Sequence, residues 1–227
     1  LVDLTVFLEG PYNTTTGAMD TDLNNAGVIP VMQPYSSDPT AVWYYSGAEI
    51  VSSMPSANVT DWVMVELRDA STPGGATGGT MIGQKAAFLL SDGSVVALDG
   101  SSMLKYYVMV ANNLYAVVYH RNHLGVMSNY ALVPVGNTYT YDFSTAAAQA
   151  YGSTNAHKDL GGGVWGMIGG DGKPDGEVNN GDKNDVWALE AGSSGYKAGD
   201  FNMDVQVNNG DKIDIWIPNV GRGSQIP

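Results

Sequence analysis

Oxygen-bearing side chains concentrate in two twelve-residue segments near the C-terminus, which start 29 positions apart (200 − 171). Both segments place Asp at loop positions 1, 5 and 12: Asp171, Asp175 and Asp182 in the first, Asp200, Asp204 and Asp211 in the second. A hard cation that takes six to eight oxygen ligands needs carboxylates spaced in this way along a tight loop. The spacing therefore predicts two calcium ions, one in each segment.

A duplication surrounds the two loops. Residues 167–192 align with residues 196–221 without gaps, and 12 of the 26 aligned positions are identical. The longest shared run is Asn-Asn-Gly-Asp-Lys, at 179–183 and 208–212. Duplicated loops with duplicated flanks predict a C-terminal unit with pseudo-two-fold symmetry.

A short helix is predicted after each loop, over 182–187 and 211–216, because the apolar residues there suit a helix better than a strand. We expect Gly192 and Gly221 to stop the two helices. We expect the equivalent tryptophans, Trp187 and Trp216, to pack on each other.

Two calcium loops, each followed by a single short helix, resemble the dockerin type I repeat. The resemblance covers about a quarter of the chain. It implies that side chains at loop positions 1, 3, 5 and 12 and the backbone carbonyl at position 7 hold the ion. The implied ligands are Asp171, Asp175, Asp182 and the carbonyl of Glu177 in the first loop, and Asp200, Asn202, Asp204, Asp211 and the carbonyl of Gln206 in the second.

Each loop departs once from the family pattern. Lys173 stands at position 3 of the first loop, and an ammonium group cannot ligate a cation, so we expect water or a carbonyl to take that place. Val205 stands at position 6 of the second loop, where the pattern has glycine. A β-branched residue held at positive φ costs on the order of 1–2 kcal/mol. We expect both loops to bind calcium, neither with an ideal set of residues.

The resemblance also implies a partner and a location. In dockerins, residues beside loop position 12 dock onto a cohesin domain. Here they are Asn180, Gly181, Lys183 and Asn184, then Asn209, Gly210, Lys212 and Ile213. The chain also resembles the C-terminal portion of Bacteroidetes-type secreted and surface proteins, in which a β module with a Leu-Glu-Gly-Pro-Tyr start precedes such a repeat. That resemblance implies an extracellular or cell-surface location.

Composition and charge exclude several classes of protein. The formal net charge of −13 would repel the phosphates of nucleic acid and suits cation binding. The chain has no cysteine, so disulfides and thiolate metal sites are impossible, and calcium is expected to act as the staple instead. No apolar run reaches the length of a membrane span, so we do not expect a membrane-spanning protein.

The first 150 residues have the pattern of β structure. Predicted strands cover 1–9, 61–68, 86–90, 94–98, 104–110, 114–119 and 138–143. The first is amphipathic, with Val2, Leu4, Val6 and Leu8 on one face. Short strands at this spacing favour a mainly β fold, an antiparallel β-sandwich, followed by the dockerin-like unit. The predicted organisation is a sandwich over 1–150, a linker over 151–163 and the calcium unit over 164–227.

No catalytic constellation stands out in the sequence. His120 and His123 are three residues apart at a predicted strand end, with no acidic third ligand nearby in sequence. We interpret them, with Arg121 and Asn122, as anchors of a loop. Glu66 is expected to face solvent. The chain is therefore predicted not to be an enzyme.

Aromatic residues near the long loops offer a route to ligand binding. They are Tyr12, Tyr35, Trp43, Tyr44, Tyr45 and Trp62. Exposed rings can stack on sugars or on partner proteins, whereas the alternative is that Trp43 and Trp62 belong to the core.

The leading hypothesis is a non-catalytic, extracellular, calcium-binding structural protein that self-associates into a filament or tethers a surface assembly. The amphipathic N-terminal strand could complete a neighbour's sheet, which predicts a homo-oligomer or polymer. The alternatives are a module that binds a separate cohesin-type partner and a carbohydrate-binding module that recognises a glycan.

Overall fold

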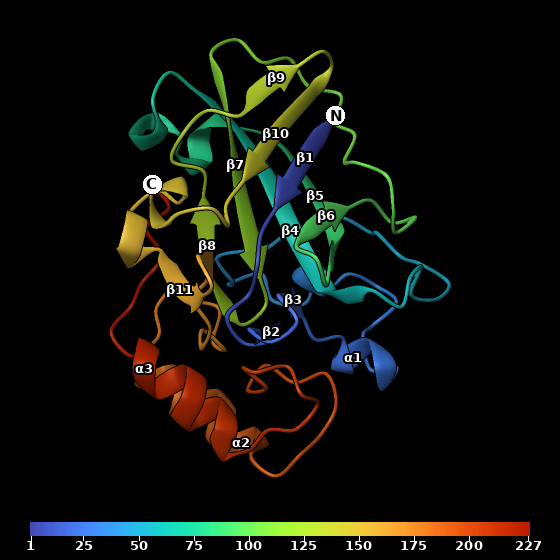
Figure 1. The fold of residues 1–227 in the computed structure, drawn as a ribbon, viewed down its shortest axis with the longest axis vertical. Helices are drawn as coiled ribbons and strands as arrows, with labels where there is room; N and C mark the ends of the chain where they lie inside the picture. Colours follow the sequence, from blue (N-terminus) through green and yellow to red (C-terminus); the bar gives the residue numbers. More distant parts are fainter.

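The computed structural model describes residues 1–227. Eight strands form one curled sheet in the order β8, β7, β4, β5, β6, β1, β10, β9 (Figure 1). Their bounds are β1 Val2–Thr5, β4 Val59–Ala70, β5 Met81–Leu90, β6 Ser94–Val96, β7 Asn113–His120, β8 His123–Met127, β9 Val133–Val135 and β10 Thr138–Asp142. Neighbouring strands are antiparallel except β1 and β10, which are parallel. Two ribbons complete the β structure: β2 Tyr12–Asn13 with β3 Ala18–Met19, and β11 His157–Gly161 with β12 Val164–Met167.

Helical segments are short, and the two longest lie near the C-terminus. A π-helical turn over Asp182–Trp187 continues into α2 Ala188–Glu190, and its repeat over Asp211–Trp216 continues into α3 Ile217–Asn219. Elsewhere the chain has α1 Asp22–Asn25 and 3₁₀ turns at Pro34–Ser36, Pro73–Gly75, Gly78–Thr80, Ala147–Gln149 and Ser153–Asn155. No helix is both long and apolar enough to cross a bilayer.

The fold is mainly β, as predicted. The predicted sandwich would have two separate sheets, whereas hydrogen bonds connect all eight strands into one sheet. The strand responsible is β6, which pairs with β5 on one side and with β1 on the other. The strands predicted over 86–90 and 94–98 are present in β5 and β6, which pair antiparallel, and Gly93 has a φ of +86° in the turn between them.

β4 lies at the centre of the sheet and is covered on both faces. It pairs with β5 and β7, and eleven of its twelve residues are buried. Glu66 is only 5% exposed, and its Oε1 accepts a hydrogen bond of 2.5 Å from Nε of Arg68. The prediction that Glu66 faces solvent was wrong. Simple alternation assumes that one face of the strand is exposed to solvent, but in the curled sheet both faces of β4 are buried.

The N-terminal strand lies inside its own sheet. β1 pairs with β6 on one edge and β10 on the other. The predicted apolar face is buried: Val2, Leu4, Val6 and Leu8 are at most 2% exposed. β1 therefore has no free edge to offer to a second chain while it remains in this sheet.

The predicted strand over 104–110 is present only at its first residue. Leu104 exchanges backbone hydrogen bonds with Val2, whereas residues 105–110, which we call the unpaired segment, make no backbone hydrogen bond to the rest of the protein backbone. Tyr107 is 85% exposed and Met109 is 91% exposed. The segment keeps the alternation of a strand but has no strand beside it.

The predicted linker holds regular structure. Residues 151–163 contain the last 3₁₀ turn and β11, and β11 pairs with β12 across the predicted boundary at Val164. Met167 in β12 and Met203 in the second loop are both part of the main hydrophobic core. Figure 1 shows α2 and α3 below the end of the sheet opposite to β9.

Acid should destabilise this part of the fold through His157. Its side chain is buried, and burial lowers its pKa to about 4, below the value of about 6.5 in an unfolded chain. The unfolded state then binds the extra proton, so stability is complete above pH 6.5 and falls as the pH drops from 6.5 to about 4, by up to about 3 kcal/mol. Urea unfolding at several pH values should show a smaller acid loss in His157→Leu than in the parent. Equal acid losses in the two proteins would contradict the assignment.

Candidate functional site

The two acidic loops share several internal hydrogen bonds at equivalent positions. In the first, Asp182 accepts from the backbone N–H groups of Lys173 at 2.9 Å and Asn179 at 2.7 Å. In the second, Asp211 accepts from the equivalent groups of Asn202 and Asn208 at 3.0 and 2.8 Å. The residue at position 12 thus ties positions 3 and 9 together in each loop.

The residue at position 1 closes each loop from the other side. Asp171 Oδ2 accepts from Gly176 N at 3.1 Å, and Asp200 Oδ2 accepts from Val205 N at 3.0 Å. The remaining oxygen of Asp171, Oδ1, is buried and has no hydrogen-bond partner. Buried carboxylate oxygens are normally satisfied, so this one calls for a partner that the protein does not provide.

Four loop carboxylates are buried at equivalent positions of the two repeats, and the cation Arg121 offsets the burial at one of them, Asp200. Asp171, Asp182, Asp200 and Asp211 are each at most 3% exposed. Burial raises the pKa of all four, to about 7 for Asp200, and repulsion from neighbouring loop carboxylates adds to the rise. A divalent ion between positions 1 and 12 would remove this penalty, because it supplies the missing positive charge.

The acidic side chains of the loops do not form a metal cage by themselves. No three acidic or histidine side chains converge closely enough to enclose a metal by themselves. The carbonyls implied at position 7, of Glu177 and Gln206, would have to complete each shell, as would water. Such shells, formed by carboxylate, carbonyl and water, are typical of calcium and not of zinc.

Both departures from the family pattern have visible consequences. The Lys173 side chain lies beside Gly181 of the same loop and forms an ion pair of 3.3 Å with the exposed Asp185. Val205 has a φ of +78°, as predicted, close to the +82° of Gly176 in the first loop. The second loop therefore carries backbone strain that the first avoids.

Gly176→Ala should destabilise the first loop by strain alone. A Cβ at this position would lie 3.7 Å from its nearest neighbours, so it has room, but the positive φ costs about 1–2 kcal/mol. Differential scanning calorimetry should show a small decrease in Tm. Gly78→Ala, at a glycine without a positive φ and with open space around it, is the matched control. Equal effects of the two substitutions would remove strain as the explanation.

The two repeats exchange contacts in a reciprocal way. Trp187 Nε1 donates to the carbonyl of Asn208 at 2.8 Å, and Trp216 Nε1 donates to the carbonyl of Asn179 at 2.9 Å. Each indole thus contacts the other repeat's loop at position 9. The two rings do not form an aromatic pair, so the prediction that Trp187 and Trp216 pack on each other was wrong, because each ring is directed to the opposite loop instead. The predicted pseudo-two-fold relation is present, although it runs through the loops.

The segments after the helices continue the exchange. Ser194 forms a β-bridge with Gln206, and Gly223, 29 residues after Ser194, forms one with Glu177, 29 residues before Gln206. Gly192 and Gly221 end the helical regions with φ values of +85° and +88°, as predicted. Each loop is held at position 7 by the other repeat, so the two sites form one folded unit.

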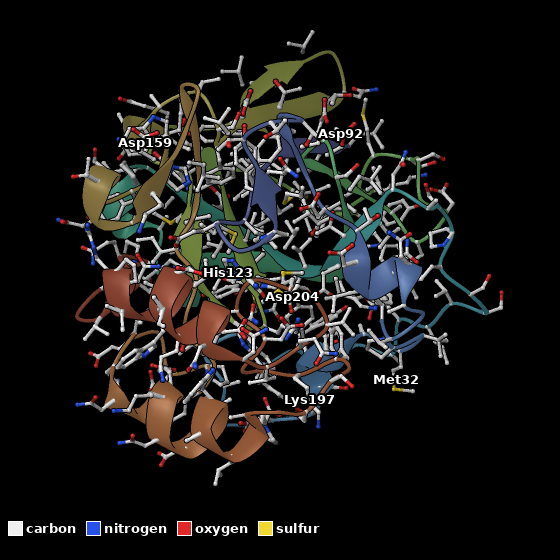
Figure 2. The ribbon with its side chains drawn as sticks, turned by 60° about the horizontal axis from the view of Figure 1, so that its bottom comes forward. Met32, Asp92, His123, Asp159, Lys197 and Asp204 are labelled. Atoms are coloured by element: carbon white, nitrogen blue, oxygen red, sulfur yellow. The ribbon has the colours of Figure 1, made fainter.

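A buried polar junction connects this unit to the sheet. Asp61 on β4 accepts from Arg121 Nε at 3.0 Å and from the Tyr196 hydroxyl at 2.8 Å. Asn122 Nδ2 donates to the carbonyl of Asp200, the first residue of the second loop, at 2.7 Å. Figure 2 labels His123, Lys197 and Asp204, which lie around this region. The predicted role of Arg121 and Asn122 as loop anchors agrees with these bonds.

The two histidines belong to the same junction. His120 Nε2 lies 3.1 Å from Asp61 Oδ2, and the Nδ1 atoms of His120 and His123 are 3.0 Å apart. His123 Nε2 accepts from Gly10 N at 3.2 Å, so the proton of a neutral His123 is on Nδ1. Burial lowers the pKa of both histidines. Asp61 is the acidic neighbour that the sequence around the two histidines does not contain. The nitrogens of both rings already take part in hydrogen bonds within the protein.

Most of the predicted binding aromatics are in the core. Trp62 and Tyr35 are fully buried, and Trp43 is 6% exposed. Tyr12 and Tyr45 are partly buried, which leaves Tyr44, at 40% exposure, as the one clearly exposed ring of the six. The sequence pattern could not separate loop aromatics that fold back onto the sheet from those that face water.

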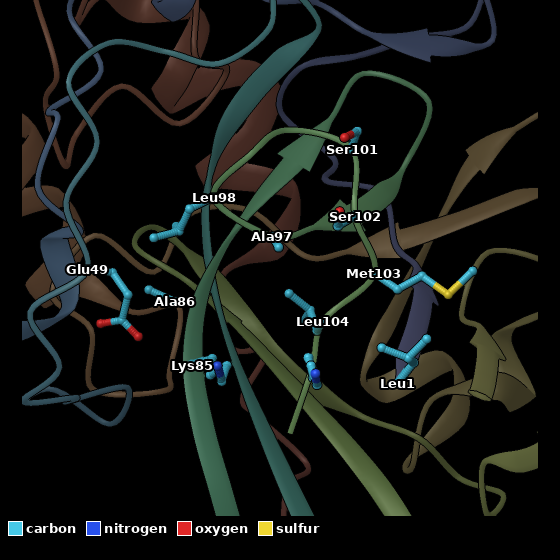
Figure 3. Close-up of a pocket in the computed structure, with 11 residues that line it drawn as sticks. Leu1, Glu49, Lys85, Ala86, Ala97, Leu98, Ser101, Ser102, Met103 and Leu104 are labelled. Carbon is cyan, nitrogen blue, oxygen red and sulfur yellow. The ribbon is translucent and has the colours of Figure 1, made fainter. Parts of the chain in front are cut away.

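The largest pocket lies away from the loops, beside Lys85 and Ala86 of β5, which precede the residues of β5 that pair with β6. It measures about 620 Å³ (Figure 3). Leu1 and Met103 lie on one side, and Glu49 and Lys85 lie on the other, with Ser102 between them. Glu49 Oε1 accepts from the Tyr45 hydroxyl at 2.6 Å, and Lys85 Nζ lies 5.8 Å from the centre of the Tyr106 ring. These polar groups therefore support the local fold.

Comparisons of the chain with protein-family models, curated proteins and solved structures found no match. The fold and the site define a mainly β protein with a duplicated acidic-loop unit attached to one end of its sheet.

Proposed function

We propose that this chain is a non-catalytic structural module of the extracellular space or cell surface, stabilised by two calcium ions. The observation that carries the proposal is the set of four buried carboxylates that accept equivalent loop hydrogen bonds in the two repeats, those of Asp171, Asp182, Asp200 and Asp211. The dockerin-like resemblance of the repeats supports the same ion. Its role would be structural, since the loops hold no group poised for chemistry beyond ligation.

Calcium binding is tested by isothermal titration calorimetry on chelator-treated protein. We expect two bound ions in the parent and weakened binding at one site in Asp175→Ala or Asp204→Ala, which are exposed position-5 residues that can be changed without leaving a cavity. Asp185→Ala, an exposed acid outside both predicted ligand sets, is the control. No heat of binding at millimolar calcium would refute the proposal.

We also propose that the chain self-associates, and the unpaired segment supports this. Four exposed apolar side chains adjoin it or belong to it, and we call them the assembly surface: Leu1, Met103, Tyr107 and Met109, with exposures of 45, 43, 85 and 91%. Free backbone N–H and C=O groups beside exposed apolar side chains favour pairing with a strand of another chain. We propose a second copy of this chain as the partner.

Assembly through the N-terminal strand, as predicted from the sequence, would require exchange of β1 between copies, because β1 is paired on both edges in its own sheet. Removal of residues 1–9 would also remove core side chains, so it would unfold the monomer and could not test assembly. A surface substitution is therefore the better experiment.

Tyr107→Ser with Met109→Ser should reduce self-association without unfolding the protein, since both side chains are exposed. Sedimentation velocity and electron microscopy with millimolar calcium would measure it. Val133→Ser with Val135→Ser, on the exposed edge strand β9, is the matched control. If both pairs of substitutions leave assembly unchanged, or if the parent stays monomeric at all concentrations, this part of the proposal fails.

A second candidate function, docking of a separate cohesin-type partner, has one observation in its favour. Ile213, Ile217 and Val220 are 53, 53 and 48% exposed at the spacing of one helix face. The aligned positions of the first repeat hold Asn184, Ala188 and Ala191. Calcium-dependent capture of a purified cohesin domain, lost in Ile213→Ser with Ile217→Ser, would support this function over self-association.

A further inference from the structure

Three polar side chains meet between the sheet and the C-terminal unit, outside the acidic loops. Glu9 lies shortly after β1, Lys158 lies on β11, and Asn219 is the last residue of α3 (Figure 1). β12 brings the first two together, because it pairs with β11 and also forms a β-bridge from Met167 to Leu8. Groups that are 149 and 61 positions apart in sequence (158 − 9 and 219 − 158) are thereby placed in contact.

Each of the three side chains contacts the other two. Lys158 Nζ donates to Asn219 Oδ1 at 2.8 Å and lies 3.0 Å from Glu9 Oε1. Asn219 Nδ2 donates to Glu9 Oε2 at 2.5 Å and to the carbonyl of Gly169 at 3.0 Å. Gly169 N in turn donates to Glu9 Oε2 at 3.0 Å. One carboxylate therefore contacts the lysine amine through one oxygen and the asparagine amide nitrogen through the other.

These contacts bring an amine close to an amide carbon. A C=O bond is about 1.2 Å long, so the hydrogen bond from Lys158 to Oδ1 leaves Nζ about 3–4 Å from Cγ of Asn219. Reacting atoms about 3–3.5 Å apart are typical of a near-attack geometry. Asn219 is 1% exposed and the Glu9 side chain is 9% exposed. Burial therefore keeps bulk water, the competing nucleophile, away from the amide.

The duplication does not account for an asparagine at this position. The aligned residue of the first repeat is Glu190 (219 − 29), and its Oε2 accepts from Gly199 N at 2.7 Å. A carboxylate therefore serves the end of the helix in the first repeat, whereas the second repeat has an amide. The two groups differ in chemistry, because the nitrogen of an amide can leave as ammonia when an amine attacks its carbon.

We propose that Lys158 and Asn219 join in an isopeptide bond, with Glu9 transferring the protons. Glu9 accepts a proton from Lys158 Nζ, and the neutral amine attacks Cγ of Asn219. Glu9 passes that proton to Nδ2 and accepts a second proton from the attacking nitrogen. The Cγ–Nδ2 bond then breaks, ammonia leaves, and Nζ keeps the single hydrogen of an amide. The reaction needs no oxidant or added reagent, and it occurs once per chain.

The bond would be a covalent staple in a chain that has no cysteine. It closes the segment from Lys158 to Asn219, which contains both acidic loops. Closing a long segment restricts the unfolded chain, as a disulfide does, and so favours the folded state. The three groups belong neither to the predicted calcium ligands nor to the assembly surface, so this inference stands apart from both of those proposals.

Intact mass spectrometry of the purified full chain tests the proposal. We expect most molecules to be lighter than the mass calculated from the sequence by about 17 Da, the mass of the ammonia released. Trypsin should fail to cleave after Lys158, and tandem spectra should show a branched peptide in which residues 213–222 are attached to it. Asn219 is the only asparagine in residues 213–222, so ring closure at the Asn-Gly pairs of the acidic loops could not produce this peptide.

Substitutions identify the groups that react. Lys158→Arg and Glu9→Gln should each have the full calculated mass, because the first removes the amine and the second removes the proton acceptor. Lys173→Arg, at a lysine in an exposed ion pair, should retain the loss of ammonia. Full mass in the parent, or a loss without the branched peptide, would overturn the proposal. A Glu9→Gln protein that still loses ammonia would overturn the role of Glu9. The measurement on the parent depends on no variant folding.

Discussion

Calcium added to chelator-treated protein, at about 100 times its dissociation constant, should raise Tm by roughly 10–20 °C. Each filled site then contributes about 2.7 kcal/mol, because the ion binds the folded loops and not the unfolded chain. Two sites together give about 5 kcal/mol, and 1 kcal/mol corresponds to about 2–4 °C for a chain of this size. Differential scanning calorimetry with and without chelator measures the change.

The reciprocal contacts between the repeats should couple the two sites. Each loop is bridged at position 7 by the segment that follows the other repeat's helix, so an empty site loosens both. Asp182→Ala alone and Asp211→Ala alone should therefore each lose more than half of the calcium-induced rise in Tm. Magnesium at the same concentration is the control, since it prefers a smaller octahedral shell. A rise of less than about 2 °C with calcium would contradict the assignment of both loops.

Asp61→Asn should destabilise the protein by about 3–5 kcal/mol, the usual consequence of leaving a buried charge without its partner. Asp61 is fully buried and contacts Arg121, His120 and Tyr196 through its two oxygens. The pKa of Asp61 is lowered from its ordinary value because the attraction of Arg121 and the hydrogen bond with His120 outweigh burial. The substitution keeps the shape of the side chain and removes its charge. Urea unfolding in saturating calcium measures the loss.

Two comparisons make this result specific to the junction. Asp3→Asn removes a charge from β1, on a side chain with no ion pair, and should change stability by less than about 0.5 kcal/mol. Adding Arg121→Gln to Asp61→Asn should recover part of the stability, because the second change removes the uncompensated guanidinium. If the double variant is as unstable as the sum of the single variants, the ion pair is not what holds the C-terminal unit to the sheet.

The local features of the acidic loops follow from the sequence. Spacing within twelve residues determines which carboxylates can meet, so the hydrogen bonds between positions 1 and 6 and between 12 and 3 lie where the repeat predicts. The positive φ of Val205 and the glycines at the helix ends are equally local, because they depend on backbone sterics of a few neighbouring residues. The buried face of β1 follows from alternation alone.

The tertiary structure decided how these pieces meet. Asp61 reaches His120 across 59 positions, and β1 lies between β6 and β10, because strand order depends on contacts between distant segments. The burial of Trp43 and Glu66 depends on how the sheet curls. Local spacing determines which groups a loop can offer. Contacts between distant segments instead require long loops to close, and the entropy lost in closing them is offset only by packing of the whole core. A short stretch of sequence contains no information about that packing.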